Sequence, residues 1–225
     1  MTPSSAPARD PASTRERLLD TAERLFAKQG FDGTSLRQIT REAGVNLAAI
    51  HYHFGSKDAL INAVFDRLIR PINEARLERL DGVEREAGEG APELERVIEA
   101  FVRPPLEASI GSGELGARRM RLVGRVHAER EHISRQMFAR QFEDVFRRFH
   151  AALGRCLPEL DPETIAWRMH FMIGAMVHVE LTAGDPSVRQ VLGPDGDGLE
   201  PDALARRLVP FLAAGMRAGE KGTAP

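Results

Sequence analysis

The 225-residue sequence is poor in cysteine, tyrosine and tryptophan, with one residue of each type. The single cysteine, Cys156, excludes an intramolecular disulfide and fits a reducing cytoplasm. The sequence also lacks an uncharged apolar run of about 18 residues, and its first segment, MTPSSAPARDPAS, has no apolar core like that of a signal peptide. We therefore predict a cytoplasmic protein with no membrane segment.

The sequence also has little excess of charge of one sign, since its formal net charge is −2. Domains that bind nucleic acids often have a basic excess, but a total averages over the parts of a chain. Residues 14–57 hold seven basic and five acidic side chains. This excess is small, so the placement of the side chains must decide whether the segment binds a nucleic acid.

Glycines and capping residues divide the amino-terminal part of the chain into three short helices. Gly30 ends the first helix and Gly44 ends the second. Asn46 can cap the third helix, which Gly55 closes. Two short helices separated only by Gly44 and Val45 have the arrangement of a helix-turn-helix unit, whose second helix enters the major groove of DNA.

The third helix has two different faces. Leu47, Ile50 and Phe54 recur at i, i+3 and i+7, so we expect them to dock this helix on the core. The other side chains then point away from the core, where they can contact phosphates or base edges. This outer set consists of Asn46, Ala48, Ala49, Tyr52 and His53, with His51 near its edge. The competing interpretation is a set of ordinary surface residues.

The remainder of the chain has helical periodicity throughout and no parallel-sheet pattern. A long helix follows residue 57, and we expect Pro71 to bend or break it. Pro104 and Pro105 are expected to end or kink a later helix. Residues 184–198 are rich in turn-forming residues and predict a mobile loop before the last helix.

Residues 162–182 are apolar on two faces of one helix. Met169 and Met172 belong to one stripe, whereas Trp167, Phe171 and His178 belong to the other. Because a helix with two apolar faces should be buried on both, we expect its own domain to cover one face and a partner subunit to cover the other. The methionine stripe favours packing over a cofactor site, although thioethers also suit apolar ligand cavities.

Several short motifs occur in a fixed order within residues 14–65. They are Gly-Phe at 30–31, Thr34, Ala-Gly-Val at 43–45, Tyr-His-Phe at 52–54, Ser-Lys at 56–57 and Leu60. In this combination the segment resembles the TetR family of bacterial transcriptional regulators. The family usually has an aromatic residue, often tyrosine, where this chain has His51.

The resemblance implies an all-α protein with an amino-terminal three-helix helix-turn-helix DNA-binding domain and a larger helical domain for effector binding and dimerisation. The expected boundaries are 13–57 for the first and 58–219 for the second, with disordered tails at 1–12 and 220–225. The implied function is a DNA-binding transcriptional regulator, specifically a ligand-released repressor that binds a palindromic double-stranded DNA operator as a dimer. The last two helices, about 162–182 and 201–218, would form the homodimer.

The resemblance also assigns residues to the two sites. Thr34 and Lys57 would bind phosphates, with Arg37 as a further phosphate contact. The complete set of expected DNA contacts is Thr34, Arg37, Asn46, Ala48, His51, Tyr52, His53 and Lys57. The effector would be small and apolar or amphipathic, because the stretch from 118 to 178 loosely resembles fatty-acid-responsive regulators. Its pocket would be lined by Phe101, Met120, Val123, His127, Phe142, Phe171, Met172 and His178.

Other patterns have competing interpretations. The sequence GSGELG at 111–116 matches G-x-G-x-x-G, but no strand precedes it, which favours a flexible loop over a dinucleotide site. The arginines between 118 and 130 form either a solvated helix face, a second anion site or a holder for a ligand carboxylate. His127 and His178 either face a pocket or are satisfied core or interface histidines. Neither has a cysteine or carboxylate at metal-ligand spacing beside it.

The rival function classes are an all-helical enzyme and a ligand-binding module without DNA binding. The sequence has no nucleophile, base and orienting residue at useful spacing, and no metal-ligand cluster or usual phosphate loop. We therefore predict no enzymatic activity, no cofactor and no metal.

Overall fold

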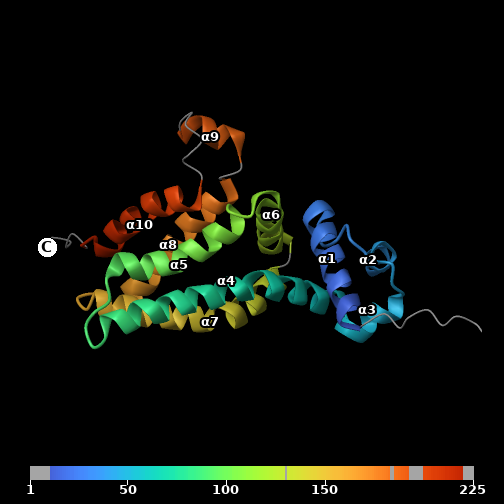
Figure 1. The fold of residues 1–225 in the computed structure, drawn as a ribbon, viewed down its shortest axis with the longest axis horizontal. Coiled ribbons are helices and arrows are strands. Elements are labelled where there is room, and N and C mark those ends of the chain that lie inside the picture. Colours follow the sequence, from blue (N-terminus) through green and yellow to red (C-terminus); the bar gives the residue numbers. More distant parts are fainter. Residues whose placement is uncertain (1–10, 130, 183–184, 193–199, 220–225) are drawn as a thin grey trace, which may run out of the picture. The chain divides into compact units, whose positions relative to one another are not determined.

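The computed structural model describes residues 11–129, 131–182, 185–192 and 200–219, whose fold is drawn in Figure 1. All regular secondary structure in these ranges is α-helical, which confirms the predicted fold class. None of the helices in this part of the chain is long and apolar enough to cross a membrane. The tails expected at 1–12 and 220–225 fall outside the described residues, except that Pro11 and Ala12 already belong to the first helix.

The chain forms two compact units. One runs to Leu68 and also takes in Arg121–Met137, and the other comprises Ile69–Met120 and the residues from Phe138 onward. The first unit contains α1 (Pro11–Gln29), α2 (Leu36–Ala43), α3 (Leu47–Phe54) and the beginning of α4 (Lys57–Ala87). Helices α1, α2 and α3 all contact one another. Their fully buried side chains include Leu18, Leu19, Phe26, Phe31, Ile39 and Ile50.

The second unit contains the rest of α4 and all of α5 (Leu94–Ser109), α8 (Pro162–Thr182), α9 (Pro186–Leu192) and α10 (Pro201–Arg217). Helices α6 (Gly113–Glu129) and α7 (Glu131–Cys156) are divided between the two units, which meet along the chain after Met120 and Met137. Helix α5 packs along α10, and both contact α8. A shared apolar core includes Phe101, Phe149, Met169, Met172, Leu212 and Met216. Burial of this core supplies most of the stability of the unit, at about 25 cal/mol per Å² of apolar surface.

Three prolines that we expected to end or bend helices lie inside unbroken ones. Helix α4 continues through Pro71, and α5 continues through Pro104 and Pro105. Pro105 has no N–H to donate to the carbonyl of Phe101. Arg76 of α4 donates its Nε–H to that oxygen instead, at 2.8 Å. A side chain from another helix therefore satisfies the carbonyl that Pro105 leaves free. Of the two expected outcomes, a bend or an end of the helix, the structure excludes the end.

The segment expected to be a mobile loop contains helix α9. The carboxylate of Asp185 accepts a hydrogen bond from the backbone N–H of Ser187 at 2.8 Å and so caps this helix. Residues 193–199 of the expected loop lie outside the described part of the chain.

The G-x-G-x-x-G segment forms the turn from α5 into α6, and a helix rather than a strand precedes it. A Cβ atom at Gly116 would lie 1.7 Å from the carbonyl oxygen of Ser109, so only glycine permits this approach of the two helices. The glycine therefore serves helix packing, and the dinucleotide interpretation has no support.

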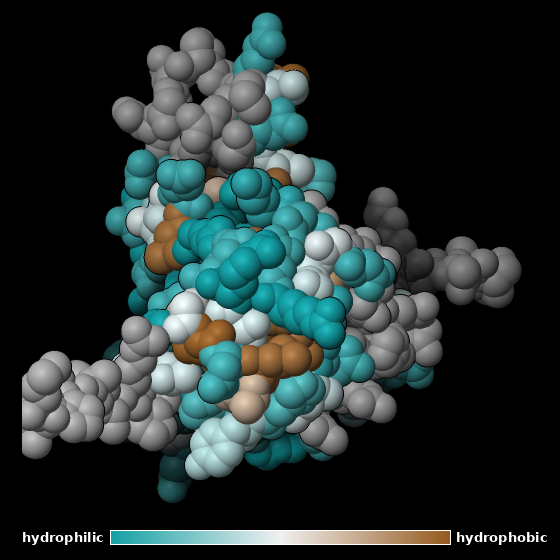
Figure 2. All heavy atoms as spheres, turned by 90° about the vertical axis from the view of Figure 1, so that its right-hand side faces the viewer, coloured by the Kyte–Doolittle hydropathy of each residue, from teal (hydrophilic) through white to brown (hydrophobic). Residues whose placement is uncertain are grey.

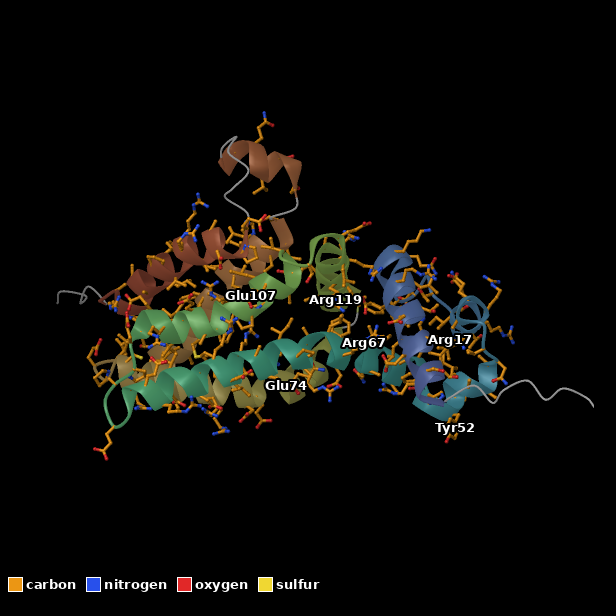
Figure 3. The ribbon with its side chains drawn as sticks, in the orientation of Figure 1. Arg17, Tyr52, Arg67, Glu74, Glu107 and Arg119 are labelled. Atoms are coloured by element: carbon orange, nitrogen blue, oxygen red, sulfur yellow. The ribbon has the colours of Figure 1, made fainter. Side chains whose placement is uncertain are left out.

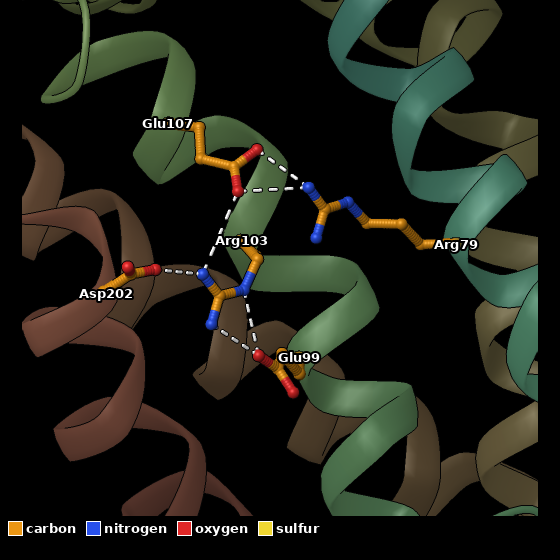
Figure 4. A network of polar contacts seen from close by, with 5 residues as sticks. All are labelled: Arg79, Glu99, Arg103, Glu107 and Asp202. Atoms are coloured by element: carbon orange, nitrogen blue, oxygen red, sulfur yellow. Dashed lines mark hydrogen bonds and ion pairs between the residues drawn. The ribbon is translucent and has the colours of Figure 1, made fainter.

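An ion-pair network joins α4, α5 and α10 within the second unit (Figure 4). Arg103 donates to Glu99 at 2.6 and 2.9 Å and also to Asp202. Arg79 donates to both carboxylate oxygens of Glu107, at 2.9 and 3.0 Å. Since exposed ion pairs contribute about 1 kcal/mol or less each, this network orients the three helices more than it stabilises them.

Candidate nucleic-acid interface

Residues of the segment itself cap both helices of the helix-turn-helix and close the turn between them. Ser35 caps the start of α2, with its hydroxyl accepting from the N–H of Gln38 at 3.1 Å. Gly44 ends α2 in the left-handed conformation, with φ 63° and ψ 39°. Asn46 caps α3 two residues later, its side-chain oxygen accepting from the N–H of Ala49 at 2.8 Å. The short turn therefore fixes the start of α3 relative to α2.

Helix α1 holds this turn from the other side. The guanidinium of Arg17 donates to the carbonyl oxygen of Gly44 at 3.1 Å and also to that of Ala43. Arg24 of α1 pairs with Glu42 of α2 at 2.5 Å. This hydrogen bond from Arg24, aided by one from Gln38, lowers the pKa of the Glu42 carboxyl below its usual value. The two arginines thus attach α1 to the end of α2, where the turn begins.

The docked face of α3 agrees with the predicted set for one residue of three. Ile50 is 2% exposed and packs in the core, whereas Leu47 is 37% exposed. Phe54 is half-buried, and the guanidinium of Arg15 lies 5.5 Å from the centre of its ring. Because α3 has only eight residues, one buried side chain near its middle and one partly covered ring at its end suffice to set which face points outward.

The outer face of α3 carries the tyrosine and histidines. Tyr52 is 83% exposed and projects away from the ribbons of α1 to α3 (Figure 3). His53 is half-buried, and its ring meets that of Tyr52 edge to face, with 5.1 Å between the centres. Asn46 and Ala48 are exposed. A flat aromatic ring beside small and polar side chains can reach base edges in a groove.

His51 is exposed, and its Nδ1 lies 3.1 Å from the carbonyl oxygen of Gly55. Because a carbonyl oxygen only accepts hydrogen bonds, this contact places a proton on Nδ1. In this tautomer Nε2 carries no proton and can accept a hydrogen bond. His51 can therefore offer a hydrogen-bond acceptor at the position where the resemblance leads us to expect an aromatic residue, often tyrosine.

The three residues expected to contact phosphates lie in different environments. Thr34 is fully buried, and its hydroxyl donates to the carbonyl oxygen of Gly30 at 2.8 Å. This placement disagrees with the expectation that its side chain binds a phosphate, because the hydroxyl is already committed inside the unit. Arg37 is exposed on α2, and Lys57 is half-buried at the first position of α4. A lysine and a helix N-terminus both favour an anion.

Figure 2 turns the right-hand side of Figure 1 towards the viewer, which is the side where α1, α2 and α3 lie. The coloured surface is mostly hydrophilic, with a few hydrophobic areas among the polar ones. Such a surface suits hydrated contacts with a polar partner better than it suits a dry protein interface.

The residues expected to line an effector pocket do not share one environment. Phe101 and Met172 are buried in the core of the second unit, and Met120, Val123 and Phe142 are half-buried. The side chain of His127 lies outside the described residues. Phe171 is 65% exposed and His178 is exposed too, which disagrees with their assignment to a pocket. They lie on the face of α8 opposite the buried Met169, Met172 and Met176.

Sequence reasoning missed a buried polar cluster in the second unit. Arg76 is 3% exposed, Asn73 is 7% exposed and Glu180 is 9% exposed. Asn73 and Arg76 share a face of α4 with the apolar Leu80, and Glu180 follows Met176 by four residues on the buried stripe of α8. The signal in the sequence was a charged residue at a core position of each helix.

The cluster makes several contacts, but its two charged groups do not meet. Arg76 donates to Asn73 Oδ1 at 3.1 Å and to Met176 Sδ at 3.6 Å, and its guanidinium lies 4.2 Å from the ring centre of Phe101. Glu180 Oε1 is buried and has no hydrogen-bond partner among the residues that the structure describes. Burial raises the pKa of Glu180 to about 7, against the opposing effect of Arg76. Burial likewise lowers the pKa of Arg76 to about 10.

Comparison with protein families decides the relationship. A model described as "Bacterial regulatory proteins, tetR family" matches residues 18–64, and one described as "Tetracyclin repressor-like, C-terminal domain" matches residues 99–215, just over half of the chain. The chain belongs to the TetR family of DNA-binding transcriptional regulators. Members of this family are regulators rather than enzymes, and they typically bind DNA operators as dimers.

Individual relatives match over different shares of the chain. The TetR-family chain is 42% identical over 65 residues to the transcriptional regulator AcrR of Shigella flexneri, covering 29% of this chain and 30% of that protein. It is 38% identical over 69 residues to the transcriptional repressor NicS of Pseudomonas putida, which is 30% of this chain and 32% of that one. These matches thus span about a third of each relative. The regulator BetI of Brucella anthropi is 29% identical over 208 residues, covering 92% and 95% of the two chains.

Solved structures share the fold over nearly the whole chain. The fatty acid degradation regulator FadR from Bacillus halodurans has a TM-score of 0.62 at 14% identity, covering 96% of this chain and all of that one. NalD of Pseudomonas aeruginosa has a TM-score of 0.61 at 23% identity, covering 92% and 98%. At these identities the likeness concerns the fold alone.

Proposed function

We propose that this protein is a cytoplasmic, ligand-released repressor that binds a palindromic operator as a homodimer. Residues 13–57 would bind DNA, and residues 58–219 would bind the effector and form the dimer. The observation that carries the DNA-binding part is the orientation of α3, which is docked by Ile50 and presents Tyr52 outward. The name of the similar NicS protein, a repressor, supports the sign of regulation.

The proposed DNA interface consists of α3 and the start of α4. Asn46, Ala48, His51, Tyr52 and His53 would face the major groove. Arg37 and Lys57 would bind phosphates, whereas the buried Thr34 would act by holding the end of α1 against the start of α2. In a two-fold dimer the α3 helices would read half-sites about 34–36 Å apart.

The proposed dimer face consists of α8 and α10. Trp167 is 55% exposed, Phe171 is 65% exposed and Phe211 on α10 is 68% exposed. Trp167 and Phe171 have ring centres 6.1 Å apart, so they form one aromatic patch on α8. Large exposed aromatic patches usually mark interaction sites, and a second copy of the same face would cover this one.

Mobility shift with the promoter region of the protein's own gene tests the DNA-binding proposal. We expect specific retardation that weakens as salt rises. Tyr52→Ala should weaken it at least ten-fold, because α3 loses its most exposed aromatic contact. Phe146→Ala is the matched control, since Phe146 is an exposed aromatic residue on α7. Equal affinity of both variants for this DNA would contradict the proposed orientation of α3.

Ligand release would operate through α4, which is continuous from Lys57 to Ala87. Lys57 is a proposed phosphate contact, and Arg76 belongs to the buried cluster of the second unit. An effector that favours one position of α4 over another would change the distance between the two α3 helices of the proposed dimer.

A further inference from the structure

The buried cluster of Arg76, Asn73 and Glu180 has hydrogen-bonding capacity that the protein does not use. A guanidinium has five N–H donors, and the contacts with Phe101, Asn73 and Met176 occupy three of them. Within the described ranges, Glu180 Oε1 has no hydrogen-bond partner although it is buried. Buried polar atoms are nearly always satisfied, so an exception in a protein core indicates either strain or a missing binding partner.

A purely structural ion pair would be built differently. Arg76 and Glu180 are joined by no hydrogen bond or ion pair in the part of the chain that the structure describes. The charge of each nevertheless shifts the pKa of the other. Two buried opposite charges that only stabilised the fold would be expected in direct contact, because desolvation is costly without it. The unused donors of Arg76 and the buried acceptor of Glu180 therefore suit a polar group that contacts both side chains.

We infer that Arg76 and Glu180 form the polar subsite of the effector site and bind the uncharged, hydrogen-bonding head group of an amphipathic molecule. A hydroxyl or amide group can accept from Arg76 and donate to Glu180 Oε1 at the same time. Asn73 holds Arg76 in place for this contact, and the rings of Phe101 and Phe142 flank the guanidinium, at 4.2 and 6.0 Å. Apolar side chains thus adjoin the polar end, as an amphipathic ligand requires. This inference rests on the proposed ligand-released function.

The charges of the subsite determine which head group it accepts. An anionic head would meet the carboxylate of Glu180, and a cationic head would meet the guanidinium of Arg76. Either adds a like charge to a buried site, where unpaired charges are costly. An uncharged head adds none, so the pair selects against both charged analogues of one ligand.

Three probes with one alkyl chain test this selection on the full-length protein by isothermal titration calorimetry at pH 8, above the pKa of about 7 of the Glu180 carboxyl, where that carboxyl is ionised. They are 1-octanol, octanoate and octylammonium. We expect octanol to bind at least ten-fold more tightly than either ion. Glu180→Leu should weaken octanol about ten-fold or more, since it removes an acceptor of a charge-assisted hydrogen bond. The matched control is Glu163→Leu, which changes an exposed glutamate of the same helix and should leave all three affinities unchanged.

Glu180→Gln provides the sharper variant, because it keeps the shape of the side chain and an acceptor oxygen. Without the carboxylate charge, Arg76 remains as the only charge of the subsite. Octanoate should then gain about ten-fold in affinity, while octanol keeps most of its own. Circular dichroism verifies that each variant is folded. No binding of octanol, equal affinities for the three probes, or no gain of octanoate in Glu180→Gln would each overturn the inference.

The same samples separate this inference from the proposed function. If octanol binds with the expected dependence on Glu180 but does not reduce operator retardation, the subsite stands and the ligand-released mechanism fails. If operator retardation is specific but octanol does not bind, the subsite fails and DNA binding stands.

Discussion

Replacing Glu180 by glutamine should make the protein more stable at neutral and alkaline pH. Its carboxyl has a pKa raised from 4.5 to about 7, chiefly by burial, because removal from water disfavours the charged form. One pKa unit corresponds to about 1.36 kcal/mol, so this shift of about 2.5 units is a penalty of about 3 kcal/mol for the ionised side chain. Glutamine is uncharged at every pH and avoids this penalty.

The direction of the pH dependence of stability follows from proton binding to Glu180. Between pH 4.5 and about 7 the folded protein holds a proton on Glu180 that the unfolded chain has released. Stability from this group is therefore fully present below pH 4.5, is lost as pH rises to about 7, and changes no further above that. Glu180→Gln does not lose this stability as the pH rises, because glutamine does not ionise. We expect Glu180→Gln to be about 3 kcal/mol more stable than the parent at pH 8 and nearly equal to it at pH 4.5.

Urea unfolding followed by circular dichroism at pH 4.5, 6, 7 and 8 measures this difference. Other groups titrate in the same range, so the relevant quantity is the free energy of unfolding of the variant minus that of the parent at each pH. Glu163→Gln, on the exposed start of α8, should show no such trend. A Glu180→Gln difference that stays constant from pH 4.5 to 8 would refute the reasoning, as would a variant less stable than the parent at pH 8.

Three other substitutions test the DNA-binding unit and the dimer. Lys57→Ala should lower the slope of log affinity for operator against log salt by about 1, as expected for one lost phosphate contact, whereas the charge-matched Arg85→Ala on the last turn of α4 should not. Gly44→Ala should cost about 1–2 kcal/mol in urea unfolding, since φ is 63° there, and an unchanged free energy of unfolding would contradict this conformation. Phe171→Asp should shift the dimer towards monomer in sedimentation, because its ring is 65% exposed and would bury about 130 Å², or about 3 kcal/mol per copy. A dimer that survives would place the interface elsewhere.

The helix-turn-helix was predictable because its signals are local. Ser35 and Asn46 cap their helices with their own side chains, and Gly44 takes the left-handed conformation between them. Each of these signals acts within three or four residues of sequence, so no knowledge of distant neighbours is needed to read them. The burial of Ile50 and the exposure of Tyr52 then follow from helical spacing.

Features that the sequence did not indicate depend on partners far away in the sequence. Helix α5 passes Pro105 because Arg76, from another helix, satisfies the carbonyl of Phe101. Phe171 and His178, which we expect in a pocket, lie on the exposed face of α8. Periodicity shows that α8 has two apolar faces, but it does not show which of them meets its own unit.

Arg76 links the proposed ligand subsite to the proposed DNA interface. Its Nε–H satisfies the carbonyl that Pro105 leaves free on α5, and its position on α4 places it on the same continuous helix as Lys57. In the proposed subsite, a ligand that accepts a hydrogen bond from an unused donor of Arg76 would add a contact to the guanidinium that already joins α4 to the Phe101 carbonyl of α5. If the position of α4 relative to α5 depended on this contact, the bound ligand would favour one state over the other, which any ligand-driven switch requires. We therefore expect Arg76→Lys, which has no fork of donors to serve two partners, to uncouple octanol binding from operator release in the mobility shift, and full release in this variant would contradict that coupling.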